Sequence, residues 1–429
     1  MLQSLNVDNT MPDYFSPTEM KKQEEEISSL LGKDILDGES MMHLRGISFL
    51  GVLNVAASVP ESLRFSRYDH SISVAYLTWL FCKNLRIKEE ISLTTTLAAL
   101  IHDVTHPPFS HSTEVYLQIR SGVETKHTSV LTKQKITKIV KEGYRSLPRS
   151  LQRDVPEKLA NRLYNLLKFR KERENYHPYI ADIFETPFCP DTFDGINRAW
   201  YALNTKEVKH RLSTEKHKYF EAINPVSLIS FITSTTPYPF VYKSEFPPTK
   251  ANRIYEFHDL MRVLYYSVIY SNWQSSAMVM FARALEIAYL DSTKFDFDQG
   301  DEQVIKKIEE NPASNKIYNL IGIGHRFYSL SKENPSLYQS ALNYYAESKK
   351  QRKSYKDIKR IIEETVAKKL KVSRELVFWH KFRPLIWSLD NVRFNEFGKG
   401  ENLWSLKWDP SEGEPSKESE IEIYYTTLL

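Results

Sequence analysis

The sequence predicts a mostly α-helical fold with a smaller mixed region at its C-terminal end. Apolar residues recur at helical spacing in three segments, residues 70–86, 90–102 and 256–290. Strand-like alternation ends the chain, where Ile421, Ile423 and Tyr425 share one face. With 429 residues, of which 41% are hydrophobic, the chain is long enough to bury a large core.

The first two of these helices are expected to meet at one end. The helix over 70–86 begins at His70, and the helix over 90–102 ends at the doublet His102 and Asp103. Neighbouring helical residues point about 100° apart, so an adjacent His and Asp converge only on something placed at the helix end, such as a metal ion. The pattern therefore predicts a shared site where the two helices meet.

The middle of the chain predicts further helices and one irregular crossing. Residues 130–170 alternate basic and apolar residues and predict two helices, with prolines between them. The proline-rich segment 235–250 predicts a surface crossing or a lid. In the segment 256–290, a stripe of Met, aromatic and small residues predicts core packing by Met280, Phe281, Ala284, Leu285 and Ala288.

The composition changes late in the chain, so we expect one domain over residues 1–295 and a helical C-terminal region over residues 296–429. The second region contains a basic run over 349–360 and an acidic linker over 411–420. The basic run is typical of a solvated helix face. The alternatives are a surface for anions or nucleic acid and an interface with an acidic neighbour. Few aromatic residues interleave with the run, so nucleic-acid binding has weak support.

The composition also limits the class of protein. The net charge of +4 fits a binder of small anions and does not by itself imply nucleic acid. Cys82 and Cys189 are too few for a disulfide framework, and the first thirty residues hold no apolar signal core, so a cytoplasmic location is expected. No apolar run reaches membrane-spanning length, so we expect no membrane partner.

The stretch A-L-I-H-D-V-T-H-P-P-F-S-H, residues 99–111, carries most of the chemistry. His70 lies upstream of it, and Asp191 follows later in C-P-D-T-F-D. Imidazole nitrogens and carboxylate oxygens without thiolate suit Fe, Mn or Zn, whereas two histidines serve Mg less well. Cys189 lies near Asp191, but a lone cysteine is usually a small buried residue, and the His and Asp set is complete without it.

The order of these blocks resembles one family, the HD-domain phosphohydrolases, which are named for the His-Asp doublet. Within that family the blocks are most similar to the deoxynucleoside triphosphate triphosphohydrolases, a group with bacterial dGTPases and an animal enzyme that joins a SAM domain to an HD domain. The matching blocks are M-H-L-R-G-I-S-F-L-G (42–51), R-F-S-R-Y-D-H-S-I-S-V-A-Y-L (64–77), H-D-V-T-H-P-P-F-S-H (102–111) and the late Asp191. The resemblance spans roughly the first two hundred residues and implies a helical HD-domain fold.

The resemblance also implies roles for individual residues. The metal ligands it implies are His70, His102, Asp103 and Asp191. The catalytic residues it implies are His106 and His127, which flank the scissile phosphate, and Glu114, which supports them. The substrate-binding residues it implies are Arg45, Phe49, Arg67, Asp194 and Arg198. The planar guanidinium of Arg67 is suited to a phosphate.

Several positions depart from the family's pattern. Phe49 replaces a glutamine and cannot hydrogen-bond a sugar hydroxyl. Thr192 and Gly195 replace the lysine and tyrosine that hold the phosphates and sugar in the family. Thr105 and Pro107 replace glycines, so we expect the loop after the His-Asp doublet to follow a different path. The metal site is predicted to be intact and the substrate pocket to be remodelled.

The predicted function is metal-dependent hydrolysis of a nucleotide, best matched by a dNTP triphosphohydrolase-like activity that releases nucleoside and triphosphate. The alternatives are a nucleotide monophosphatase, a phosphodiesterase or nuclease of the same superfamily, and an HD module that binds a nucleotide without catalysis. The expected cofactor is Fe, Mn or Zn at the His-Asp site, with Mg accompanying the substrate phosphates. The expected partners are the nucleotide and further copies of the chain in a homo-oligomer.

Overall fold

The computed structural model is mostly helical, as predicted. It describes residues 14–121, 130–177, 180, 183–184, 189–203, 223–234, 241–242, 256–257, 259–261, 263–269, 272–290, 295–322, 328–381, 393–394 and 421–425. The predicted catalytic residue His127 and most of the segment 235–250 therefore lie outside the described residues.

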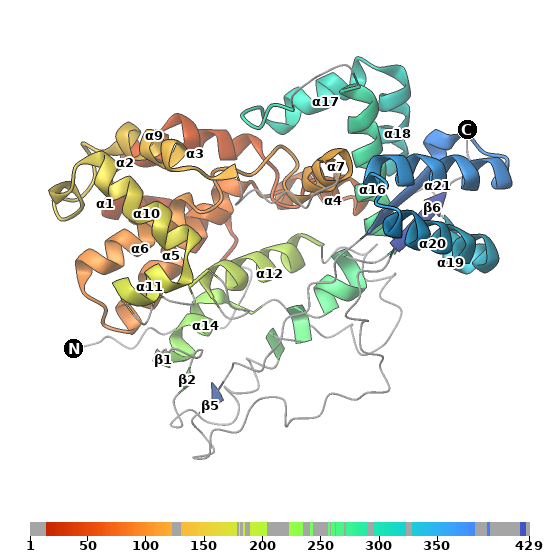
Figure 1. Cartoon of the computed structure of the whole chain (residues 1–429). Coiled ribbons are helices and arrows are strands. Elements are labelled where there is room, and N and C mark those ends of the chain that lie inside the picture. The colour runs from red at the N-terminus through yellow and green to blue at the C-terminus, as the bar shows by residue number, and fades with distance from the viewer. Residues whose placement is uncertain are drawn as a thin grey trace.

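One lobe of the molecule, at the left of Figure 1, holds the helices around the His-Asp doublet. Its helices are α1 (Pro17–Leu31), α2 (Lys33–Asp37), α3 (Glu39–His43), α5 (Arg67–Asn84), α6 (Glu89–Ile101), α9 (Lys133–Gly143), α10 (Pro156–Lys168) and α11 (Arg170–Tyr176). Short 3-10 helices lie between them, η2 (Leu44–Gly46), η3 (Glu61–Leu63) and η4 (Leu151–Arg153). Helices α12 (Pro190–Leu203) and α14 (Pro225–Phe231) pack against α5 and against each other.

A second lobe lies at the right of Figure 1. Its helices are α16 (Asn272–Ala288), α17 (Asp301–Glu309), α18 (Pro312–Gly322), α19 (Leu330–Glu333), α20 (Pro335–Lys350) and α21 (Tyr355–Leu370). The π-helix η7 (Leu264–Ile269) precedes α16, and the 3-10 helix η8 (Arg374–Leu376) follows α21. Helices α4 (Leu53–Ala56) and α7 (His111–Ser121) pack against α16 and so connect the two lobes.

Helix α5 begins at Arg67 because a capping box closes its first turn. The Ser66 hydroxyl accepts a hydrogen bond from the Asp69 backbone N–H at 3.1 Å. In return, the Asp69 carboxylate accepts one from the Ser66 backbone N–H at 2.8 Å. This reciprocal pair fixes the start of the helix and places His70 on its first turn.

The predicted helices within the first lobe are confirmed. Helices α5 and α6 match the segments 70–86 and 90–102 and pack side by side, and α9 and α10 lie within 130–170. The predicted core stripe is also confirmed on α16, where four of its five residues are buried, Met280, Phe281, Ala284 and Leu285. None of the helices in the described parts of the chain is long and apolar enough to cross a membrane.

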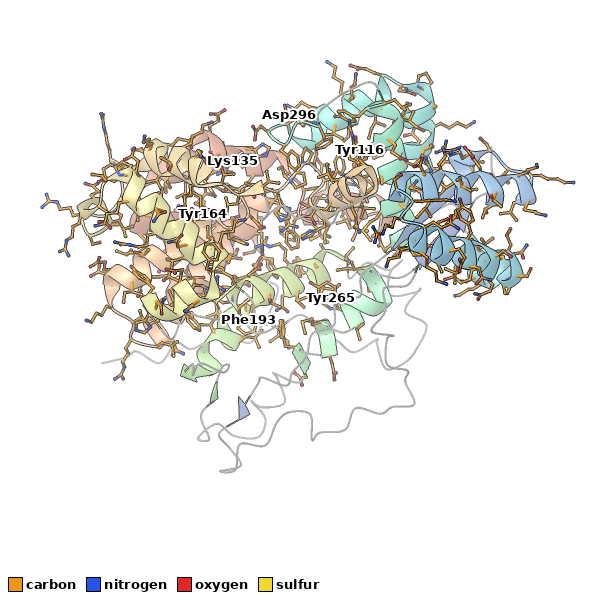
Figure 2. The ribbon with its side chains drawn as sticks, in the orientation of Figure 1. Tyr116, Lys135, Tyr164, Phe193, Tyr265 and Asp296 are labelled. Carbon is orange, nitrogen blue, oxygen red and sulfur yellow. The ribbon has the colours of Figure 1, made fainter. Side chains whose placement is uncertain are left out.

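The two lobes share a hydrophobic core at their junction. One buried cluster contains Phe109 and Tyr116 together with Phe281 of α16 and Val304 of α17. Figure 2 shows Tyr116 on α7 at this junction, where its ring centroid lies 5.7 Å from that of Phe295. The core therefore continues across the expected domain boundary between residues 295 and 296.

Two small sheets complete the described structure. The first contains β3 (Tyr328–Ser329), β6 (Ile421–Tyr425) and β4 (Val377–Lys381), with β6 in the centre and antiparallel to both neighbours. The second contains β1 (Ile232–Ser234), β2 (Val241–Tyr242) and β5 (Arg393–Phe394), with β2 antiparallel to β1 and parallel to β5. The predicted terminal strand is confirmed as β6.

Among the described side chains of the basic run over 349–360, one basic residue is buried and so does not belong to a solvated helix face. Lys359 of α21 is buried and forms an ion pair with Glu363, which also pairs with Arg283 of α16. Burial lowers the pKa of Lys359, and the carboxylate of Glu363 opposes that shift. This ion-pair network joins the end of the second lobe to α16.

Candidate metal centre

His70 lies on the first turn of α5 with both ring nitrogens close to carboxylates. Its Nδ1 donates a 2.6 Å hydrogen bond to Oδ2 of Asp194, because an ionised carboxylate can only accept. Its Nε2 lies 3.1 Å from Oδ1 of Asp191, in the first turn of α12. A histidine that donates one N–H to a carboxylate presents its other nitrogen to a metal in a fixed orientation.

His102 caps the C-terminal end of α6 and is oriented in the same manner. Its Nδ1 donates a 2.7 Å hydrogen bond to the backbone carbonyl of Ala99. Its Nε2 is buried and has no hydrogen-bond partner among the described residues. A buried polar atom without a hydrogen bond is costly, and a bound metal ion would satisfy this one.

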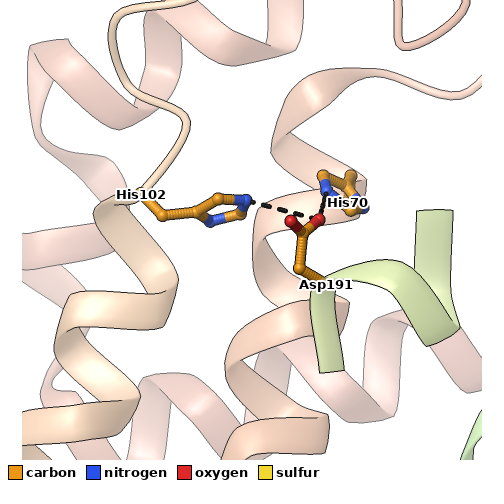
Figure 3. Close-up of side chains that lie close together, drawn as sticks. All are labelled: His70, His102 and Asp191. Atoms are coloured by element: carbon orange, nitrogen blue, oxygen red, sulfur yellow. Dashed lines mark hydrogen bonds and ion pairs between the residues drawn. The ribbon is translucent and has the colours of Figure 1, made fainter. Parts of the chain in front are cut away.

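Three helices bring the predicted ligands together (Figure 3). Oδ1 of Asp191 lies 3.1 Å from Nε2 of His70 and 3.8 Å from Nε2 of His102. Asp103 adds a second carboxylate, with Oδ1 at 3.3 Å from Nε2 of His102 and Oδ2 at 3.7 Å from Nε2 of His70. The four side chains therefore converge, although His70 and Asp191 are 121 residues apart in the sequence.

The charges of the site shift the pKa values of its members. Burial lowers the pKa of His102, but the carboxylates of Asp103 and Asp191 outweigh burial and raise it to about 9. Burial raises the pKa of Asp191, but the neighbouring imidazoles of His102 and His70 outweigh burial and hold this pKa well below its usual range. The site therefore favours ionised carboxylates facing a positive charge.

The donor set fits a transition metal. Two imidazole nitrogens and two carboxylate oxygens suit Fe, Mn or Zn. The thiol of Cys189 is buried and lies 3.3 Å from the hydroxyl of Thr192, so its sulfur has another neighbour. His70, His102 and Asp191 offer donor atoms within 4.8 Å of one another, and Asp103 lies beside them, so these four residues could hold the ion.

Asp194 and Arg198 form a buried ion pair behind His70. Nε of Arg198 donates to Oδ2 of Asp194 at 2.8 Å, and a terminal nitrogen donates to Oδ1 at 2.9 Å. Both side chains are 0% exposed, so neither has a surface with which to contact a ligand. Asp194 instead contacts the ring of His70, so the predicted contact of these two residues with substrate finds no support in this arrangement. The Asp and Arg at i and i+4 of one helix were the sequence signal for this pair.

Arg67 lies beside the centre, one turn before His70. A terminal nitrogen of its guanidinium lies 2.8 Å from Oδ2 of Asp103, and its Nε donates to the hydroxyl of Ser110 at 2.9 Å. Another terminal nitrogen lies 3.3 Å from the backbone carbonyl of Phe49. The guanidinium therefore holds Asp103 in place, and its contact with a substrate phosphate stays a prediction.

A second group of donors lies next to the centre. Nε2 of His106 lies 3.2 Å from Oδ1 of Asp103, and the His106 ring centroid lies 4.9 Å from that of His111. Nδ1 of His111 lies 2.9 Å from a carboxylate oxygen of Glu114. One donor atom from each of these three residues falls within 4.8 Å of the others. The structure thus brings His106 and Glu114 together and adds His111, which was not among the predicted site residues.

Phe49 forms an apolar wall of the site. Its ring centroid lies 4.9 Å from that of His70, and the guanidinium carbon of Arg67 lies 4.7 Å above the ring. A Cβ atom at Gly195 would lie 3.7 Å from Cε1 of His70 and 3.8 Å from Cζ of Phe49. A side chain at position 195 would therefore point toward this wall, and the glycine leaves that space open.

Arg45 lines a surface cavity that is not lined by the predicted metal ligands. Its guanidinium pairs with Glu24 at 2.7 Å and lies 3.8 Å above the ring of Tyr68. It lines a cavity of about 860 Å³ together with residues such as Ser48 and Asp301, and none of the four predicted metal ligands lines this cavity. The position of Arg45 therefore does not support a contact with a substrate held at the centre.

The sequence of residues 67–171 matches the HD domain family. The match runs from the first turn of α5 to the start of α11. His70, His102 and Asp103 lie within it, whereas Asp191 lies beyond it and reaches the centre from α12. The HD domain therefore supplies three of the four convergent side chains.

Similarity to other proteins extends in part beyond the HD domain. A stretch of 82 residues is 30% identical to an uncharacterized protein of Methanocaldococcus jannaschii, and it covers 19% of this chain and 17% of that protein. A solved structure of a hypothetical protein from Aquifex aeolicus has a TM-score of 0.58 and 18% identity over 91% of this chain and 90% of its own. A phosphohydrolase from Bacteroides thetaiotaomicron has a TM-score of 0.59 and 15% identity over 91% of this chain and 94% of its own. The two structures show that the fold is shared along most of the chain.

Proposed function

We propose that this chain is a metal-dependent phosphohydrolase that acts on nucleotides, with release of nucleoside and triphosphate from a deoxynucleoside triphosphate as its reaction. The observation that carries the proposal is the convergence of two imidazoles and two carboxylates at the ends of α5, α6 and α12. The similar fold of a protein described as a phosphohydrolase supports it. A cytoplasmic location and a homo-oligomeric state belong to the same proposal and rest on the sequence alone.

The residues around the centre divide the chemical work. His70, His102, Asp103 and Asp191 would hold a divalent ion, which would supply Lewis acidity toward water and a phosphoryl oxygen. Arg67 holds the carboxylate of Asp103, and Asp194 fixes the ring of His70. His106 is placed to hold a proton for the leaving oxygen, because its Nε2 lies 3.2 Å from the Asp103 carboxylate, which stabilises the imidazolium.

His106→Ala should lower turnover without removing the metal. A positioned acid or base contributes about a hundredfold or more to the rate, so we expect kcat to fall by at least that factor. The measurement is steady-state hydrolysis of the best nucleotide, combined with elemental analysis of the same preparation. His177→Ala is the matched control, because this histidine caps the far end of α11, and it should keep the parent rate. An unchanged kcat in His106→Ala would remove this residue from the chemistry.

The reaction class is tested by product analysis. The protein is incubated with nucleoside mono-, di- and triphosphates and a phosphodiester, each with Mn, Mg, Fe or Zn. Triphosphate as the product supports the proposed reaction. Orthophosphate or a nucleoside monophosphate would instead support a monophosphatase, phosphodiesterase or nuclease. Binding without turnover would indicate a nucleotide-binding module.

A nucleotide monophosphatase, or a phosphodiesterase or nuclease, is the second candidate. Thr192 favours it, since the family that the sequence resembles carries a lysine at this position, and a cationic phosphate partner is therefore missing. The hydroxyl of Thr192 lies 3.3 Å from the sulfur of Cys189. A substrate with fewer phosphates needs fewer such partners.

We expect weak discrimination between ribo and deoxyribo substrates. Phe49 and Gly195 form an apolar and open wall beside the centre, without a hydrogen-bonding group for the sugar. An apolar pocket rejects an added hydroxyl by only about a hundredfold. The measurement is kcat/KM for matched ribo and deoxyribo pairs, with Phe49→Gln as a variant that should change the ratio. A deoxyribonucleotide preference of about a thousandfold or more would show that another residue selects the sugar.

A further inference from the structure

The loop that carries His106 contains a strained turn. Phe109 and Ser110, just before α7, have φ angles of 58° and 52°. This is the left-handed region, which side chains other than glycine rarely adopt and which is unfavourable for a bulky residue. Such a turn persists only where the surrounding contacts over-determine it.

Contacts within the first lobe fix only part of this turn. The hydroxyl of Ser110 donates to the backbone carbonyl of Ser48 at 2.6 Å and accepts from Nε of Arg67 at 2.9 Å. These bonds hold Ser110 against the segment that precedes α4. They do not involve the backbone N–H of Phe109, which needs another hydrogen-bond acceptor.

Asp301 of the second lobe accepts that hydrogen bond. It is the first residue of α17, and its Oδ1 accepts from the backbone N–H of Phe109 at 2.6 Å. Its Oδ2 accepts from the backbone N–H of Ser48 at 3.0 Å. One carboxylate therefore ties together two segments that lie 192 and 253 residues before it in the sequence.

We propose that Asp301 is a positioning residue that holds the strained turn at Phe109 and thereby keeps His106 beside Asp103. The turn begins three residues after His106 and leads directly into α7, which carries Glu114. The consequence for His106 rests on the proposed function, whereas the anchoring of the turn does not. The second lobe thus supplies a contact that holds the loop carrying His106.

Burial makes the charged form of the Asp301 carboxylate unfavourable. Burial raises the pKa of Asp301 to about 6, although hydrogen bonds from Ser48 and Phe109 oppose the shift. At pH 8 the folded protein therefore holds a charge that burial disfavours. A neutral side chain of the same shape removes that cost, but it offers one acceptor oxygen where the carboxylate offers two.

The variant Asp301→Asn tests the proposal through amide hydrogen exchange on the full chain. We expect the amides of residues 105–112 to exchange at least about tenfold faster than in the parent, because their opening becomes easier. Amides within α5 and α6 should keep their parent rates. The melting temperature at pH 8 should equal or exceed that of the parent, and the Mn²⁺ content after loading should be unchanged.

Two further variants complete the test. Asp298→Asn is the matched control, because Asp298 borders the same cavity but pairs with Lys135 at the surface, and it should leave exchange at 105–112 unchanged. Asp301→Glu keeps the charge but displaces the carboxylate, and it should also speed exchange at the turn. Parent-like exchange in both Asp301 variants would overturn the proposal. Faster exchange throughout the chain would overturn it as well, since Asp301 would then act on the stability of the whole fold.

Discussion

Replacing His102 and Asp191 together by alanine should release the bound metal from the chain. These residues contribute a ring nitrogen and a carboxylate oxygen that lie 3.8 Å apart and face the same point. We expect the metal content to fall from about one ion per chain to background in elemental analysis, because two of the four ligands are lost. The fold should remain, since Asp191 is 37% exposed and His102 caps a helix end.

The matched control for this experiment is His106→Ala. His106 lies 3.2 Å from Asp103 but is not among the four convergent ligands, so this variant should keep its metal. Circular dichroism separates metal loss from unfolding in both variants. The ligand assignment is wrong if the double variant retains the parent's metal, or if His106→Ala loses as much.

The variant Asp194→Asn should lower both the free energy of unfolding and the affinity for metal. Asp194 and Arg198 are both 0% exposed, so the substitution leaves a buried guanidinium without its carboxylate, at a cost of about 3–5 kcal/mol. His70 also loses the charged acceptor of its Nδ1, which typically weakens metal binding by about 10- to 100-fold. Urea unfolding and metal titration measure the two effects separately.

Asp37→Asn provides the comparison for that variant. Asp37 forms an i,i+4 pair with Lys33 at 3.7 Å on the surface of α2, and exposed pairs contribute about 0–1 kcal/mol. The two variants remove the same charge from the same spacing and differ in burial. If Asp194→Asn cost no more than Asp37→Asn in stability and left metal affinity unchanged, Asp194 would not be the group that orients His70.

The helices and the convergence of His70, His102, Asp103 and Asp191 could be predicted because their signals are local or belong to ordered motifs. The apolar spacing around Ile72 and Leu97 marks α5 and α6, and the doublet His102 and Asp103 lies where one of them ends. Alternation over Ile421–Tyr425 marks β6 in the same way. Each of these patterns can be seen within a short stretch of the sequence.

The supporting contacts could not be predicted because they depend on how distant elements pack. Asp194 and Arg198 were predicted to bind substrate, but only the packing of α12 on α5 shows that Asp194 contacts His70 and that Arg198 pairs with Asp194. The buried position of Lys359 follows from its contact with α16, and its basic neighbours gave no sign of it. Asp301 has no motif around it, and its two partners lie in another lobe.

The electric charge of the centre becomes positive when a divalent ion enters. At neutral pH His102 is protonated, because its pKa is raised to about 9, so the positive charges of His102, Arg67 and Arg198 balance the three negative charges of Asp103, Asp191 and Asp194. A divalent ion that displaces the proton of His102 would leave one net positive charge. In a site of low dielectric constant, an anionic substrate is attracted more strongly by the second state than by the first. The anion would therefore bind after the cation, so the supply of metal would decide when the centre is filled.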